Sequence, residues 1–232
     1  MVSIEPHRFP GVFTITEDGR TLLATRSLVP GQSVYGERIV MTEEGHFRVW
    51  SLNRSKLAAA MQNGLNEMPI QPGSKVLYLG ASSGTTVSHV SDIVGPQGVV
   101  YAVEFSPTIA RGLIRLAASR SNIVPIIDDA RHPARYAPIV SSQIDVTYQD
   151  IAQPDQARIL HDNVSTFCSY GAWAMIAIKA RSIDSTSDVN QIYSREISKL
   201  DGLGLEVIEK IDLEPFDRDH VFAVCRVRED IK

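Results

Sequence analysis

Residues 76–86 read VLYLGASSGTT, an apolar strand followed by a turn with two glycines and the start of a helix. Gly80 and Gly84 carry no side chain, so the backbone there can come close to a ligand. In an open α/β sheet, the turn from a strand to a helix lies at the carboxyl edge, where ligands bind. The stretch therefore predicts a ligand-binding loop after the first strand of an α/β sheet.

Strand-like and helix-like segments alternate on both sides of this loop. Apolar runs predict strands at 75–79, 99–103, 122–127, 144–148 and 172–178. Helical spacing and capping residues predict helices at 55–68, 85–94, 106–116, 153–169 and 188–201. Two final strands, at 205–213 and 221–227, are joined by a short turn and should pair antiparallel. Near-continuous apolar strands are typical of a parallel sheet with helices on both faces, so we predict a doubly wound, Rossmann-like α/β fold with seven strands, the last ones antiparallel.

The first part of the chain has a different pattern. Short β-type runs occur at 12–15, 21–24, 38–41 and 47–50, and turn residues separate them at 17–20, 30–31 and 43–45. This pattern predicts a small β-rich N-terminal domain over residues 1–52. The alternating α/β domain then covers residues 53–232.

Composition limits the class of protein. The chain has 232 residues, of which 44% are hydrophobic and 22% are charged, with both signs mixed. Two cysteines, Cys168 and Cys225, form no CxxC pair, which argues against a disulfide framework and against a zinc site. No basic and apolar leader is visible, and no apolar run approaches the roughly 20 residues of a membrane span. We therefore expect a cytoplasmic protein with no bound metal and no membrane contact.

Acidic residues follow the next two strands after the loop. Glu104 ends the second strand, where an acid typically accepts hydrogen bonds from ribose hydroxyls. Asp128 and Asp129 end the third strand and are suited to contact an adenine amine. A dinucleotide site usually reads GxGxxG, but position 82 is serine, and the loop has no P-loop lysine. An adenosine ligand without pyrophosphate, such as S-adenosylmethionine, fits this pattern better.

Five separated motifs resemble one known family, the fibrillarins. The loop at 79–92 (LGASSGTTVSHVSD) closely resembles the fibrillarin cofactor loop, and the similarity continues at 101–106, 148–154, 178–184 and 212–216. It extends to residues 35–38, so it covers nearly the whole chain. The Gly/Arg-rich leader of the eukaryotic members is absent, which indicates the archaeal type.

The resemblance implies an enzyme that uses S-adenosylmethionine to methylate ribose 2′-hydroxyls of pre-rRNA and tRNA. Its seven-stranded fold would be that of the S-adenosylmethionine-dependent methyltransferases. The chain would act inside a box C/D guide-RNA particle, with a Nop-family scaffold protein and a kink-turn-binding ribosomal-type protein as partners. A net charge of −4 agrees with this, because a protein that binds RNA alone usually has a basic excess.

The resemblance also implies the site residues. The catalytic residues would be Lys56, Asp150, Lys179 and His220. The cofactor-binding residues would be Gly80, Ala81, Thr85, Thr86, Glu104, Phe105, Asp129, Ala130, Asp150 and Gln153. Lys179 would contact the 2′-hydroxyl, either as a base or as an orienting cation, and the sequence leaves both roles open.

Each catalytic residue also has a structural interpretation. Lys56 could be a solvated lysine in a first helical turn, Lys179 could form a structural ion pair with Asp150, and His220 could be a turn residue. We expect His89, in the helix after the loop, and Cys225, in the last strand, to be structural.

Three other functions fit part of the pattern. A small-molecule O-methyltransferase often holds magnesium with several carboxylates, and no acidic cluster surrounds Asp150. A nicotinamide dehydrogenase would need the missing third glycine. A non-catalytic scaffold with the same fold is the third alternative, and it would not require all four catalytic residues.

Overall fold

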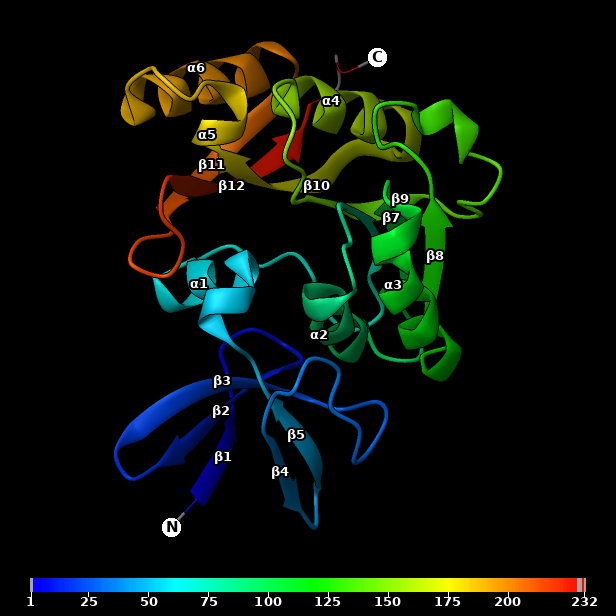
Figure 1. The fold of residues 1–232 in the computed structure, drawn as a ribbon, viewed down its shortest axis with the longest axis vertical. Helices are drawn as coiled ribbons and strands as arrows, with labels where there is room; N and C mark the ends of the chain where they lie inside the picture. Colours follow the sequence, from blue (N-terminus) through cyan, green and yellow to red (C-terminus); the bar gives the residue numbers. More distant parts are fainter. Residues whose placement is uncertain (1, 229–230, 232) are drawn as a thin grey trace.

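Two sheets organise the chain, a small one formed by the N-terminal residues and a larger one flanked by helices (Figure 1). The computed structural model describes residues 2–228 and 231. No helix among these residues is long and apolar enough to cross a lipid bilayer.

The small sheet is antiparallel, with the strand order β1-β2-β3-β5-β4. Its strands are β1 (Val2–Pro6), β2 (Val12–Glu17), β3 (Arg20–Arg26), β4 (Ile39–Thr42) and β5 (Gly45–Val49). Asp18 and Gly19 both have positive φ, as the tight turn predicted between β2 and β3 requires. The first strand was not predicted, because its apolar–polar alternation covers only residues 2–5, most of it is exposed and it ends in a proline.

The large sheet has seven strands in the order β11-β12-β10-β9-β6-β7-β8. These strands are β6 (Lys75–Leu79), β7 (Val99–Glu104), β8 (Ile123–Ile127), β9 (Ile144–Gln149), β10 (Cys168–Lys179), β11 (Leu205–Asp212) and β12 (His220–Val227). Strands β8, β7, β6, β9 and β10 pair in parallel, and β12 runs antiparallel to both of its neighbours. The predicted fold class, including the antiparallel final pair, is confirmed.

Helices cover both faces of the large sheet (Figure 1). They are α1 (Lys56–Gln62), α2 (Thr85–Val94), α3 (Pro107–Ser119), α4 (Gln156–Phe167), α5 (Ala180–Ile183) and α6 (Val189–Gly202), with 3-10 turns at Leu52–Arg54 and Pro133–Arg135. Strand β10 shows how the core is divided between the faces. Met175 and Ala177 join the cluster packed by α1, α2 and α3, while Ala174, Ile176 and Ile178 join the cluster packed by α4 and α6.

Two element boundaries differ from the prediction by more than three residues. Helix α1 ends at Gln62 instead of continuing to residue 68, because Gly64 has a φ of 97° and turns the chain. Leu65 and Met68 are nevertheless buried, so their apolar spacing reflected the core and not a helix. Strand β10 begins at Cys168, before its apolar run, with an irregular register up to Trp173.

The small sheet packs on α2 through buried polar side chains. Arg48 from β5 contacts Asp92 and Ser88 of α2, and His89 of α2 accepts or donates hydrogen bonds with Thr25 and Tyr35. His89 is fully buried, and burial lowers its pKa well below the usual value. Both it and Cys225, which is also fully buried, have structural positions, as expected.

Candidate active site

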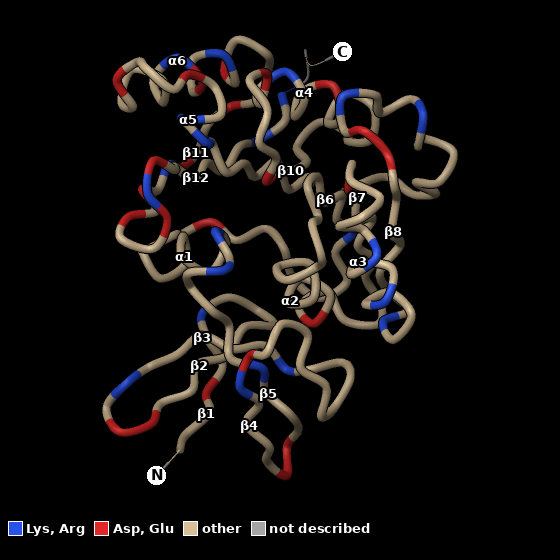
Figure 2. Tube along the Cα trace, viewed as in Figure 1, with Lys and Arg blue, Asp and Glu red and all other residues tan. Residues whose placement is uncertain are grey.

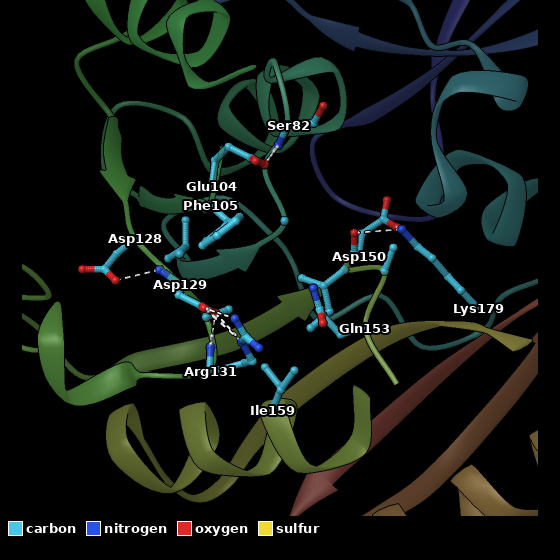
Figure 3. A pocket seen from close by; sticks show the side chains of 15 residues that line it. Ser82, Glu104, Phe105, Asp128, Asp129, Arg131, Asp150, Gln153, Ile159 and Lys179 are labelled. Carbon is cyan, nitrogen blue, oxygen red and sulfur yellow. Dashed lines mark hydrogen bonds and ion pairs between the residues drawn. The ribbon is translucent and has the colours of Figure 1, made fainter. Parts of the chain in front are cut away.

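A cavity lies at the carboxyl edge of the large sheet, where β6, β7, β8, β9 and β10 end (Figure 3). It is lined by Gly80, Ser82, Val103, Glu104, Phe105, Asp128, Asp129, Ala130, Arg131, Asp150, Ile151, Ala152, Gln153, Ile159 and Lys179. These include seven of the ten predicted cofactor residues and two of the four predicted catalytic residues.

Gly80 permits the close approach of two strand ends. Its φ is 83°, and a Cβ atom there would lie only 2.7 Å from the backbone oxygen of Asp150. The amide of Asp150 donates to the Leu79 oxygen at 2.9 Å, which fixes the ends of β6 and β9 together. A side chain at position 80 would therefore force apart the two segments that form the floor of the cavity.

Glu104 is held at the tip of β7 by two backbone amides. Its carboxylate accepts from the amide of Ser82, in the loop after β6, and from the amide of Ser106, each at 2.8 Å. Ser106 is the N-cap of α3, where its hydroxyl accepts from Ile109. The carboxylate thus connects the glycine loop to the next helix and faces the cavity in a fixed orientation (Figure 3).

The far side of the cavity is formed by the residues after β7 and β8. Phe105 is 66% exposed, which is unusual for a phenylalanine beside a cavity and leaves a ring face available for stacking. Asp129 pairs with Arg131, whose Nε lies 2.9 Å from one carboxylate oxygen. This hydrogen bond is the main cause that lowers the pKa of the Asp129 carboxyl.

Three predicted cofactor residues do not line this cavity. Ala81 and Thr86 are buried beneath the loop, and the Thr86 hydroxyl donates to Ser55 at 3.1 Å. Thr85 faces a separate hollow beside α3. Conversely, several lining residues were not predicted as site residues: Ser82, Val103, Asp128, Arg131, Ile151, Ala152 and Ile159. Two of these residues could have been predicted from the sequence, because Ser82 lies in the glycine loop and Asp128 follows the third predicted strand. Ile159 could not, because it is one of several apolar residues of α4.

A cluster of charged side chains lies next to the cavity and contains all four predicted catalytic residues. Asp150 is at its centre, with the Lys179 Nζ 2.8 Å and the Lys56 Nζ 3.2 Å from its Oδ1. Lys179 Nζ also donates to the backbone oxygen of Asp150 at 3.0 Å. Asp150 and Lys179 face the other lining residues across the cavity (Figure 3), so the cluster opens directly onto it.

Strand direction explains why these residues meet. Asp150 follows β9 and Lys179 ends β10, which are parallel neighbours. Because β12 is antiparallel to β10, its first residue, His220, pairs with Lys179. Lys56 belongs to no strand of the sheet. It is the first residue of α1, whose N-cap is Ser55.

A fifth charged residue, Asp217, completes the cluster. Its Oδ2 lies 3.3 Å from Lys56 Nζ, and its Oδ1 lies 3.0 Å from His220 Nδ1. Asp217 was not predicted as a site residue, although an acid three positions before a histidine in a turn was a usable signal.

Electrostatics within the cluster favour charged groups. Burial by itself would lower the pKa of Lys56, but the carboxylates of Asp150 and Asp217 together outweigh it and raise that pKa. Burial would raise the pKa of Asp217, but the hydrogen bond with His220 and the charge of Lys56 lower it. The cluster is therefore a set of alternating ammonium and carboxylate groups at the edge of the cavity.

Comparison with known proteins identifies the family. A family model described as Fibrillarin matches residues 4–229. The chain is 49% identical over 227 residues to the fibrillarin-like rRNA/tRNA 2′-O-methyltransferase of Pyrococcus horikoshii, which covers 97% of this chain and 99% of that relative. The crystal structure of Aeropyrum pernix fibrillarin in complex with natively bound S-adenosyl-L-methionine matches with a TM-score of 0.90 at 46% identity, over 97% of this chain and 99% of that chain. A structure of a fibrillarin/Nop5p complex matches with a TM-score of 0.84 at 36% identity, over 96% of this chain and 100% of that chain. The resemblance seen in the five sequence motifs is confirmed, and this chain belongs to the fibrillarin family.

Proposed function

We propose that this chain is an S-adenosylmethionine-dependent methyltransferase that acts on ribose 2′-hydroxyls of rRNA and tRNA. The observation that carries the proposal is that the Lys179–Asp150 pair lines the same cavity as Glu104 and Phe105. One cavity thus contains residues suited to bind the adenosine of the cofactor and a charged pair suited to bind a ribose hydroxyl. Relatives over nearly the full length carry the same activity in their names or bind the same cofactor.

The residues of the cavity fit S-adenosylmethionine. Glu104 has a fixed carboxylate with oxygen lone pairs for ribose hydroxyls, and Phe105 offers a ring face for the adenine. Asp129, Ala130 and Gln153 would complete the adenosine end and the amino-acid end of the site, with Gly80 leaving room for the ligand backbone. The cofactor supplies a methyl group bound to a positively charged sulfur, which makes the methyl carbon electrophilic.

The charged cluster would prepare the ribose oxygen. Both contacts of Lys179 with Asp150 use its Nζ as a donor, so we assign it the role of an orienting cation that donates to the 2′-oxygen. Asp150 holds Lys179 and Lys56 in place. As the new carbon–oxygen bond forms and the carbon–sulfur bond of the cofactor breaks, the proton of the hydroxyl must pass to a base. The His220 imidazole would offer a nitrogen lone pair for this proton.

We also propose that the chain works inside a box C/D guide-RNA particle. A relative has been solved as a fibrillarin/Nop5p complex, which supports a Nop-family scaffold as a partner of this chain. Basic and acidic residues are interspersed along the trace (Figure 2), and the net charge is −4. A chain with mixed charges and a negative net charge is poorly suited to bind RNA phosphates alone, so the scaffold, a kink-turn-binding protein and the guide RNA would bring the substrate.

Reconstitution tests this function. We expect the full chain, mixed with a Nop-family protein, a kink-turn-binding protein, a box C/D guide RNA and methyl-labelled S-adenosylmethionine, to label one ribose of a target RNA. The labelled nucleotide should move when the guide sequence is changed. Methylation of free nucleosides but of no guided RNA would contradict the proposal and favour a small-molecule methyltransferase.

The role of Glu104 in cofactor binding can be measured on the chain alone. We expect Glu104→Ala to weaken S-adenosylmethionine binding by about 10- to 100-fold, because hydrogen bonds to a charged group contribute about 1.5–3 kcal/mol. Isothermal titration calorimetry measures this change. Glu206→Ala is the matched control, since Glu206 is half-exposed on β11 and faces Arg228 at 3.8 Å. Equal affinities of the two variants would remove Glu104 from the cofactor site.

A further inference from the structure

Asp217 lies in the loop between β11 and β12, which is fixed against α1 at two places. The side-chain amide of Asn63, at the end of α1, donates to the backbone oxygens of Asp212 and Glu214 at 2.7 and 2.8 Å. Lys56, at the beginning of α1, contacts the Asp217 carboxylate. The loop therefore places Asp217 at a defined position relative to the first turn of the helix.

The two oxygens of Asp217 contact two different catalytic candidates. Oδ2 faces Lys56 at 3.3 Å, and Oδ1 faces His220 Nδ1 at 3.0 Å. Lys56 thus lies between two carboxylates, Asp150 on one side and Asp217 on the other. The charges of the two lysines, Lys56 and Lys179, and of the two carboxylates, Asp150 and Asp217, cancel. His220 is joined to this group through Asp217.

The contacts of His220 determine which ring nitrogen carries a proton. Nδ1 lies 2.6 Å from the backbone oxygen of Arg218 and 3.0 Å from Asp217 Oδ1, and both of these atoms can only accept. Nδ1 must therefore carry hydrogen. In the neutral ring, the lone pair is then on Nε2, which is the nitrogen left free to accept a proton.

We infer that Asp217 is a positioning residue for the proposed methyl transfer. Together with the Arg218 carbonyl, its carboxylate keeps His220 in the Nδ1–H form. It also holds Lys56 against Asp150, so that the second lysine, Lys179, remains oriented at the cavity. The inference rests on the proposed function, but the tautomer of His220 is a property of the chain itself. A carboxylate that fixes the tautomer of a histidine is a known arrangement in hydrolase sites.

Asp217→Asn tests the kinetic part, since it keeps the shape and removes the charge. In the assembled particle, we expect kcat to fall by about 100-fold, because small displacements of reacting groups have effects of this size. The KM for the target RNA and the calorimetric Kd for S-adenosylmethionine should change by less than about twofold, because Asp217 does not line the cofactor cavity. Asp217→Glu, which restores the charge, should recover most of the rate.

Asp219→Asn is the matched control. Asp219 has similar exposure, lies in the same loop and pairs with Arg181 at 3.3 Å. Its φ of 59° is a conformation that asparagine tolerates well. This variant should methylate at the wild-type rate, and a loss equal to that of Asp217→Asn would show only that the loop is sensitive to charge.

Nitrogen-15 NMR of the free chain tests the tautomer without any methylation. Wild-type His220 should be mainly Nδ1–H when neutral, and Asp217→Asn should increase the Nε2–H fraction. A wild-type Nε2–H ring, or wild-type kcat in Asp217→Asn, would overturn the inference. If the wild-type particle methylates no RNA while the tautomer is as expected, the proposed function fails and the positioning of His220 stands. If Asp217→Asn does not fold, the wild-type tautomer and Asp217→Glu still decide the question.

Discussion

Replacement of Lys179 by methionine is expected to lower the single-turnover rate of RNA methylation by about 100- to 1,000-fold, the usual effect of removing one donor to a reacting oxygen. Methionine has a similar length but no donor, so it cannot donate a hydrogen bond to the 2′-oxygen or to Asp150. The Lys56–Asp150 pair would persist at 3.2 Å, and the fold should therefore be kept. The rate is measured in the assembled particle with enzyme in excess over labelled cofactor.

The control for this substitution is Lys75→Met. Lys75 is exposed at the start of β6, the opposite edge of the sheet from the cavity, and we expect the wild-type rate. Cofactor affinity should be similar in both variants, which separates a loss of chemistry from a loss of binding. If Lys179→Met methylates as fast as Lys75→Met, the chain would be a scaffold that retains the fold without its chemistry.

Much of the fold could be predicted because its signals are local. Apolar runs located β6 to β9 and the final pair, and the glycine loop identified the edge of the sheet that carries the cavity. The errors arose where tertiary packing decides the structure. Leu65 and Met68 had helical spacing, but the chain turns at Gly64. Both residues lie in the following loop, and their side chains are buried in the core.

The residues of the candidate site also differ in how well the sequence predicts their positions. Residues at the ends of parallel strands, such as Glu104, Asp150 and Lys179, could be expected to converge, because strand direction alone brings them to one edge. Strand direction does not predict the contacts of Asp217 and Arg131, since both residues lie in loops and loop conformation determines their partners. Lys56 and His220 were predicted through the family resemblance, and the reason for their proximity is the antiparallel pairing of β12 with β10 and the position of α1.

The second large effect is expected at the contact between the small sheet and α2. Arg48→Met should lower the free energy of unfolding by about 3–5 kcal/mol, the usual cost of removing one partner of a buried ion pair. Arg48 is fully buried and contacts Glu37 at 2.6 Å, Asp92 at 2.7 Å and Ser88 at 2.7 Å. Without it, the carboxylate of Glu37 loses its cation inside the protein. Asp92 keeps Arg120 as a cation and the hydrogen bonds from Thr25 and Leu28.

Chemical denaturation followed by circular dichroism measures this loss. Arg38→Met is the matched control, because Arg38 also pairs with a glutamate at 2.6 Å, but both side chains are substantially exposed. Exposed pairs contribute about 0–1 kcal/mol, so this variant should be nearly as stable as wild type. Equal stability of the two variants would mean that the buried cluster does not stabilise the contact between the small sheet and α2.

Arg48→Met should also weaken cofactor binding at temperatures where the chain is still folded. Ser88 and Asp92 belong to α2, and this helix begins directly after the glycine loop that forms one wall of the cavity. A helix that loses its buried contacts with the small sheet can shift, and the loop must shift with it. Calorimetry below the unfolding transition should therefore show a higher Kd for S-adenosylmethionine in Arg48→Met than in Arg38→Met. An unchanged Kd would show that the loop is positioned by the large sheet alone, and that the small sheet contributes stability without shaping the cavity.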